Sequence, residues 1–151
     1  MLTGGWTEKF ISKLKSYDPP LVGVVGPNHR GGNMAILTYD FVHRTHIDIF
    51  GFYYPRLFTD WWGDDWMTRV YKPNRSSKIG DVRLVHTLGL GRRYMAHWQA
   101  KKHLQGQLIH DMDIIARSAG IEFDTVFIIH ALFISQEHER ILKVKKADKA
   151  R

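Results

Sequence analysis

One short segment of the chain combines carboxylates with aromatic rings. It reads Asp-Trp-Trp-Gly-Asp-Asp-Trp over residues 60–66. Apolar rings lower the local dielectric and a neighbouring negative charge acts in the same direction, so we expect a raised pKa for Asp64 or Asp65. A carboxyl group with a raised pKa is suited to act as a general base. The segment therefore predicts a catalytic carboxylate set among tryptophan rings.

The same carboxylates also have a structural interpretation. Asp60 is a suitable N-cap for a helix over residues 60–71. Within such a helix Asp65 and Arg69 are four residues apart, which is the spacing of an ion pair on one helix face. Spacing alone leaves both the catalytic and the structural interpretation open.

Histidines supply the candidate metal ligands. His86 ends a predicted strand over residues 82–86, where an imidazole can bind a divalent metal or make a structural hydrogen bond. His43 and His46 are neighbours on one face of a predicted helix over residues 41–50, an arrangement that allows a zinc pair. No third ligand accompanies that pair in the sequence.

A glycine-rich segment over residues 26–33 is the remaining candidate for ligand binding. Its sequence, Gly-Pro-Asn-His-Arg-Gly-Gly-Asn, predicts a loop. Such a loop lets the backbone approach a phosphate or a sugar. The segment does not have the spacing of a P-loop or of a dinucleotide-binding motif.

The elements that must position these residues alternate between helices and short strands. Helices are predicted over residues 7–17, 41–50, 60–71 and 108–118, with another that begins near residue 92; strands are predicted over residues 21–25, 35–38, 82–86 and 121–134. The polar segment 75–81 is predicted as a loop. This pattern indicates an α/β fold, with a small mixed or partly parallel sheet and helices packed on it.

Composition narrows the class of protein. The chain has 151 residues, a length that suits one domain, and a net charge of +7, which favours an anionic partner. It has no cysteine, so disulfide and thiolate chemistry are excluded. No apolar run approaches the ~20 residues of a membrane span, and the N-terminus does not read as a signal peptide. The sequence therefore predicts a soluble chain and leaves its compartment unknown.

The order of the motifs carries more information than any single motif. Along the chain they are Gly-Trp-Thr-Glu-Lys-Phe-Ile, Val-Gly-Val-Val-Gly-Pro with the glycine-rich loop, Phe-Val-His-Arg-Thr-His, Phe-Tyr-Tyr-Pro, Trp-Trp-Gly-Asp-Asp-Trp and Leu-Val-His. This order, over roughly residues 4–95, resembles the C-terminal, acceptor-binding half of GT-A-fold glycosyltransferases. The resemblance implies transfer of a sugar from a nucleotide donor to a hydroxyl group of a glycan or protein acceptor.

The resemblance also implies roles for individual residues. In the family a carboxylate pair opens a helix beneath the acceptor, and in inverting members its second residue is the base. Asp64 and Asp65 match this pair, which makes Asp65 the preferred base and inversion the preferred outcome. His86 matches a ligand of the divalent metal, manganese or magnesium.

The implied substrate-binding residues come from two segments. They are Gly31, Gly32 and Asn33 of the glycine-rich loop, and Trp61, Trp62 and Trp66 around the acceptor cleft. If the resemblance holds, the loop, the carboxylate pair and His86 should converge on one concave surface, with carboxylate and imidazole within about 10 Å of a shared position.

The family binds its nucleotide with an N-terminal half that ends near an Asp-x-Asp motif, and the resemblance begins after that motif. We therefore expect a fragment or one half of a split enzyme, inactive alone. Residues 1–105 would form the acceptor-side half domain and residues 106–151 a helical and strand extension with a basic tail. The alternative is a non-catalytic binding module that uses a basic, aromatic-rich surface to bind nucleic acid or carbohydrate.

Overall fold

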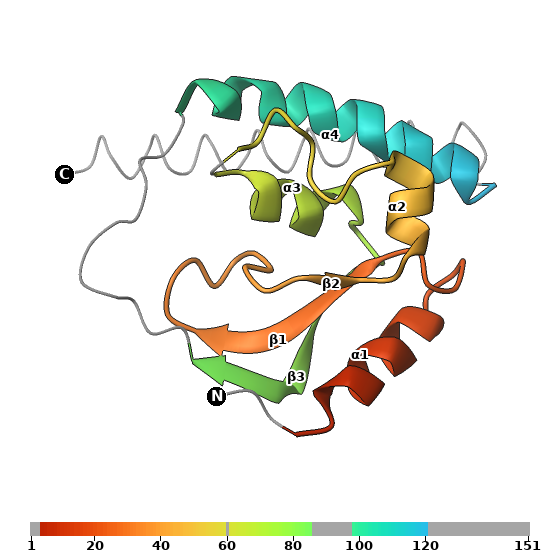
Figure 1. The fold of residues 1–151 in the computed structure, drawn as a ribbon, viewed down its shortest axis with the longest axis vertical. Helices are drawn as coiled ribbons and strands as arrows, with labels where there is room; N and C mark the ends of the chain where they lie inside the picture. Colours follow the sequence, from red (N-terminus) through yellow and green to blue (C-terminus); the bar gives the residue numbers. More distant parts are fainter. Residues whose placement is uncertain (1–3, 60, 86–97, 121–151) are drawn as a thin grey trace.

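The computed structural model describes residues 4–59, 61–85 and 98–120. Its elements are helix α1 (Trp6–Lys15), strands β1 (Val24–Arg30) and β2 (Phe41–Val42), helices α2 (Thr45–Phe50) and α3 (Gly63–Val70), strand β3 (Ser76–Val85) and helix α4 (Trp98–Ser118). Figure 1 shows the helices packed around the sheet. The predicted α/β class, with a small mixed sheet and packed helices, is confirmed.

The sheet has three strands in the order β2-β1-β3. β1 runs antiparallel to β2, with Val24 opposite Val42. It runs parallel to β3, and the register shifts between Pro27 and Asn28. This irregularity falls at the residue that has no backbone N–H to donate to a ladder. Both kinds of pairing occur on β1, so the sheet is mixed.

Helices cover both faces of the sheet (Figure 1). On one face, Phe10 and Leu14 of α1 pack with Val25 and Val82. On the other face, Val24 joins the larger core, which α3 and α4 complete. Adjacent strand residues point to opposite faces, so β1 contributes Val24 to one core and Val25 to the other.

The larger core is built around aromatic rings. Trp66 of α3 is fully buried and packs edge-on against Phe50, with ring centroids 5.3 Å apart. Its Nε1 donates a hydrogen bond to Oδ2 of the buried Asp111, 3.0 Å away. Because Asp111 lies on α4, this bond ties α3 to α4 within the core.

Several predictions of local structure are wrong. The segment 26–33 is a strand as far as Arg30, and the polar segment 75–81 forms the first part of β3. The strand predicted over residues 35–38 is absent among the described residues, and β2 occupies the first part of the helix predicted over 41–50. In each case strand pairing, which composition does not report, decides the backbone conformation.

Gly26 shows why a loop-like composition can lie inside a strand. A Cβ atom at this position would lie 2.5 Å from the carbonyl oxygen of Tyr39. The glycine is therefore needed for a close approach of two backbone segments, and it does not mark a turn.

The helix predictions agree with the structure more closely than the strand predictions do. The helix predicted over 7–17 is confirmed as α1, and the one over 60–71 as α3, which begins at Gly63. The predicted helix over 108–118 is the second half of the continuous helix α4, so the predicted division after residue 105 falls inside one helix. The predictions for Asp60, for residues 86–97 and for residues 121–151 lie outside the described part.

Candidate functional site

The first turn of α3 carries the two carboxylates singled out by the sequence. The chain enters α3 through Trp62, which has a left-handed backbone with φ of 79°. Gly63 follows, and a Cβ there would lie 3.2 Å from the ring of Tyr54. Asp64 and Asp65 then stand in the first turn, where the positive end of the helix dipole stabilises negative charge.

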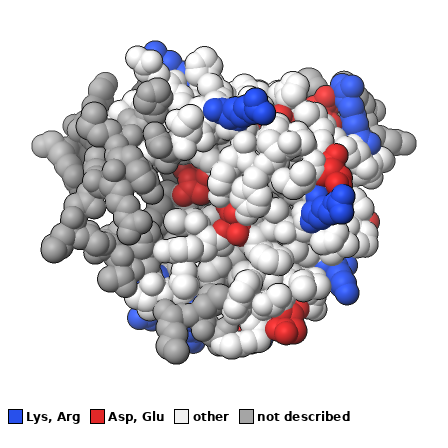
Figure 2. Space-filling view, in the orientation of Figure 1, with Lys and Arg blue, Asp and Glu red and all other residues white. Residues whose placement is uncertain are grey.

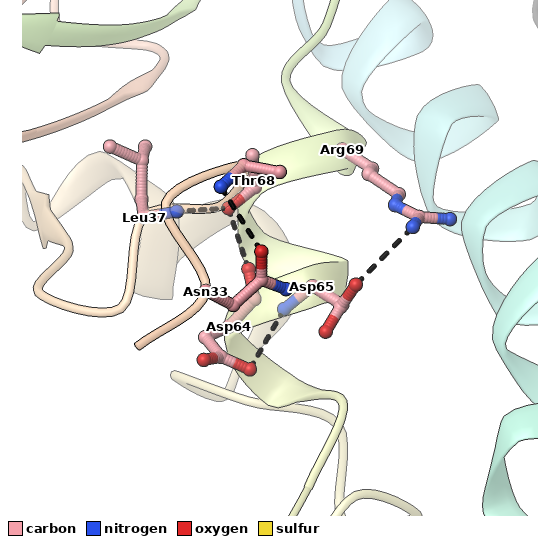
Figure 3. Close-up of polar contacts among 7 residues, drawn as sticks. Asn33, Leu37, Asp64, Asp65, Thr68 and Arg69 are labelled. Atoms are coloured by element: carbon pink, nitrogen blue, oxygen red, sulfur yellow. Dashed lines mark hydrogen bonds and ion pairs between the residues drawn. The ribbon is translucent and has the colours of Figure 1, made fainter. Parts of the chain in front are cut away.

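Asp65 is held by an ion pair within α3. Nη2 of Arg69 lies 3.2 Å from Oδ1 of Asp65 (Figure 3). The side chains are only 13% and 17% exposed, so solvent screens this pair less than a surface pair. The predicted structural role of Asp65 is confirmed.

Asp64 is in a different electrostatic position. Its Oδ1 accepts a hydrogen bond from the backbone N–H of Asp65 at 3.0 Å (Figure 3). Burial raises the pKa of the Asp64 carboxyl, and the charge of Asp65 raises it further. The raised pKa that the sequence predicted for one of the two carboxylates is found at Asp64.

A hydrogen-bonded chain joins the segment after the glycine-rich turn to α3. The hydroxyl of Thr68 donates to the backbone carbonyl of Asp64 at 2.7 Å, and its oxygen accepts from the backbone N–H of Leu37 at 2.8 Å. Figure 3 shows these bonds beside the start of α3. The turn that carries Asp64 is therefore positioned by a segment distant in sequence.

The predicted loop is reduced to a turn after β1, in which two glycines have left-handed backbone. Gly31 and Gly32 have φ of 86° and 69°, values that glycine adopts without strain. Oδ1 of Asn33 accepts a hydrogen bond from the backbone N–H of Ala35 at 3.1 Å, so its side chain shapes the turn. Nζ of Lys78 donates to the carbonyl of Met34 at 2.5 Å and ties the turn to β3.

Asp40 is a carboxylate that the sequence analysis missed. It accepts hydrogen bonds from the hydroxyl groups of Tyr53 and Tyr54, the second at 2.5 Å. Burial raises the pKa of Asp40, and its charge contributes to the raised pKa of Asp64. No motif spacing joins Asp40 to Tyr53 and Tyr54, and only the fold brings them together.

The three predicted tryptophans occupy different environments. Trp66 has no exposed surface and Trp62 is 9% exposed, whereas Trp61 is 37% exposed. Trp66 therefore belongs to the hydrophobic core, and of the three predicted tryptophans only Trp61 is substantially exposed. Trp98, at the start of α4, is the most exposed described tryptophan at 64% and was not predicted.

The contacts of His46 do not support the zinc pair that its spacing from His43 allowed. His46 is buried, with Nδ1 2.7 Å from the hydroxyl oxygen of Tyr71 and Nε2 2.9 Å from the carbonyl of Tyr53. Burial lowers the pKa of His46, which favours its neutral form. With both ring nitrogens hydrogen-bonded inside the core, His46 is a structural residue.

No metal site forms within residues 4–59, 61–85 and 98–120, because no three histidine, aspartate or glutamate side chains come together there. His86, the predicted metal ligand, lies outside these ranges. None of the described helices is long and apolar enough to cross a bilayer.

Basic residues do not form one patch on the face drawn in Figure 2. Lysine and arginine side chains lie there in separate groups, and acidic side chains lie nearer the middle.

Comparison with known proteins adds no assignment: no family model, curated protein or solved structure matches the chain.

Proposed function

We propose that this chain is the acceptor-binding part of an inverting glycosyltransferase, with Asp64 as the general base. The observation that carries the proposal is the environment of Asp64. Its carboxyl is half-buried, its pKa is raised, and it stands on the first turn of a helix that the exposed Trp61 precedes in the sequence. Such a carboxylate takes a proton more readily than an ordinary aspartate, as a base must.

The contacts of the two side chains make Asp64 a better base than Asp65. Protonating Asp65 would weaken its ion pair with Arg69, whose guanidinium would lose its anionic partner in a site that is mostly shielded from water. Protonating Asp64 relieves repulsion from Asp65. The base is therefore moved by one residue from the position that the resemblance favours.

In the proposed reaction, the acceptor hydroxyl lies against Asp64. As its oxygen forms the new bond to the anomeric carbon, its proton passes to Asp64 and the bond to the nucleotide diphosphate breaks. A single displacement of this kind inverts the anomeric configuration. Trp61 and the edge of Trp62 supply apolar surface for the acceptor ring.

The nucleotide-binding half and the divalent metal follow from the resemblance alone. A manganese or magnesium ion supplies charge neutralisation for a departing diphosphate. No group of three potential ligands lies within the described residues, and no step above is assigned to such an ion.

The test is a pair of conservative substitutions in a protein that joins this chain to a nucleotide-binding half. Asp64→Asn should lower the transfer rate by ~10²–10⁴ while donor affinity stays near its original value, because the base acts on the acceptor. Asp65→Asn, which removes the charge that pairs with Arg69 and leaves the Asp64 carboxyl in place, should cost much less. Loss at Asp65 with none at Asp64 would return the base to Asp65, and loss at neither would overturn the proposal.

The chain alone provides a second test. Mixed with manganese, sugar nucleotides and candidate acceptors, the purified 151-residue protein should show no enzyme-like turnover, because the proposal assigns the donor site to a separate nucleotide-binding half. Robust turnover would contradict the expected division of the enzyme into two halves.

The nucleic-acid alternative gains no support from the face in Figure 2, where the basic groups are separate and acidic groups lie between them. A carbohydrate-binding module without catalysis would share the exposed tryptophans. It differs from the proposed enzyme in one measurable respect, because Asp64→Asn would then leave every activity of the protein unchanged.

A further inference from the structure

Three tryptophans and one lysine from two separate segments form a continuous surface, here named the tryptophan platform: Trp61, Trp62, Trp98 and Lys101. The ring centroids of Trp61 and Trp62 are 6.4 Å apart, and those of Trp62 and Trp98 are 5.7 Å apart. Trp62 is the buried centre, and the more exposed rings of Trp61 and Trp98 flank it. Asp64 follows Trp62 by two residues, so the platform and the carboxylate belong to the same end of α3.

The exposure of Trp98 is not explained by the packing of α4. This helix turns Ala100, Leu104 and Leu108 toward the core, whereas Trp98 is 64% exposed. A single exposed apolar residue is ordinary, but two exposed indoles that flank a third make a candidate binding surface. Indole faces carry a negative quadrupole, which attracts the slightly positive C–H groups on the apolar face of a sugar ring.

Lys101 adds a cation to the same surface. Its Nζ lies 5.2 Å from the ring centroid of Trp62 and 5.7 Å from that of Trp98. These contacts hold the ammonium group beside the rings. A neutral sugar would only stack on the rings, whereas a sugar with a carboxylate would also form an ion pair with Lys101.

We propose that the tryptophan platform is an acceptor subsite for an acidic sugar, one whose ring stacks on Trp98 or Trp61 and whose carboxylate pairs with Lys101. The inference rests on the proposed function and names the class of acceptor for the site at Asp64. Arg69 pairs with Asp65, so among the described carboxylates of α3 it is Asp64 that would repel an acidic group, and such a group is directed toward Lys101. Charge therefore sets the orientation of the acceptor.

The experiment titrates the isotope-labelled 151-residue chain with a glucuronic-acid disaccharide and with its carboxyl-reduced counterpart, while NMR follows the tryptophan indole N–H signals. We expect the Trp98 and Trp61 signals to shift, and the acidic disaccharide to bind at least about tenfold more tightly, the effect of one charge-assisted hydrogen bond. Equal affinity for the two disaccharides, or no shift of either indole, would overturn the proposal.

Four variants assign the effect to the platform. Lys101→Met should remove the preference for the acidic disaccharide, whereas Lys102→Met, the matched change at the next exposed lysine, should keep it. Trp98→Ala should weaken binding of both disaccharides, and Trp98→Phe, which keeps an aromatic face, should restore part of it. A preference that survives Lys101→Met would contradict the proposed pairing.

Asp64→Asn separates this proposal from the proposed function. If the platform is correct, this variant still binds the acidic disaccharide at Trp98. If this variant keeps its binding and its transfer rate is unchanged, the proposed function is contradicted and the proposal for the platform is not. If the transfer rate depends on Asp64 but the protein shows no preference for an acidic acceptor, only the proposal for the platform is contradicted.

Discussion

The two faces of the sheet bury different kinds of side chain. The core beneath α1 is apolar apart from the Tyr17 hydroxyl, and it consists of Phe10, Leu14, Tyr17, Val25 and Val82. On the opposite side the elements around α3 and α4 also bury His46, Thr68 and Asp111. Burying a polar group costs free energy unless a partner satisfies it, and each of these three has a hydrogen-bond partner.

The two faces are therefore stabilised by different kinds of interaction. The α1 face gains stability from non-directional burial of apolar surface. The α3 face depends on directional bonds, which specify where the first turn of α3 and its carboxylates lie. The effects of substitutions on the two faces should therefore differ in their physical cause as well as in their size.

The largest effect is expected at the centre of the α3 face. Trp66→Ala should lower the free energy of unfolding by about 3–5 kcal/mol, because it opens a cavity and removes one donor from buried Asp111. The matched control is Trp61→Ala, which removes the same side chain from an exposed position and should cost far less. Urea denaturation of both variants makes the comparison, and equal losses would contradict the described core.

The next effect is a dependence on pH. Because the folded pKa of Asp64 is raised above its ordinary value of 3.8, the folded protein binds this proton more tightly than the unfolded chain does. Stability contributed by Asp64 should therefore increase as pH falls through the raised folded pKa toward 3.8, and be lost as pH rises again. The slope should not exceed about 1.4 kcal/mol per pH unit for one proton.

The measurement is the difference in unfolding free energy between the wild-type chain and Asp64→Asn over this range of pH. Carboxyl NMR sharpens it, because Asp65→Asn removes a repelling charge and should lower the pKa of Asp64. An unchanged Asp64 pKa in that variant would show that the two carboxylates are not coupled.

A smaller effect is expected where α3 begins. Gly63→Ala places a Cβ 3.2 Å from the Tyr54 ring, so that ring must shift, and we expect a loss of about 1 kcal/mol. Gly80→Ala is the control, since nothing lies within 4 Å of a Cβ there, and it should change stability by less than about 0.5 kcal/mol. Thermal unfolding would show whether the two glycines differ.

The smallest effect is expected on the surface of the α1 face. Lys9 of α1 pairs with Asp81 of β3, and both side chains are substantially exposed. Solvent and salt screen such a pair, so Lys9→Met should leave the unfolding free energy unchanged within error. A clear loss that disappears in high salt would show that this face also depends on a directional contact.

Several features could be predicted because they depend on local spacing. The periodicity of residues 7–17 specifies α1, and the alternation of apolar runs specifies the α/β class. The helical conformation of Asp64 and Asp65, and the pairing of Asp65 with Arg69, follow from residues within one or two turns, whereas the predicted start near Asp60 lies before the observed start at Gly63. These are interactions over a few residues, which a sequence displays directly.

Other features depended on contacts between distant segments. Composition suggested loops at residues 26–30 and 76–81, yet β1 and β3 pair there. Asp40 reaches Tyr53 and Tyr54 only because β2 and α2 fold back beside them. Backbone groups with a ladder partner adopt a strand even where glycine and proline are frequent, and the partner lies elsewhere in the chain.

The contrast is clearest among the aromatic residues and histidines. By type alone, Trp61, Trp62 and Trp66 were equivalent candidates for ligand contact, and His46 was a candidate metal ligand. The amino-acid sequence determined that rings and carboxylates would stand together at the start of α3. Only tertiary packing decided that Trp66 and His46 face the core, that Trp98 lies beside Trp62, and that Asp64 has the raised pKa, because burial depends on which other segments cover each side chain.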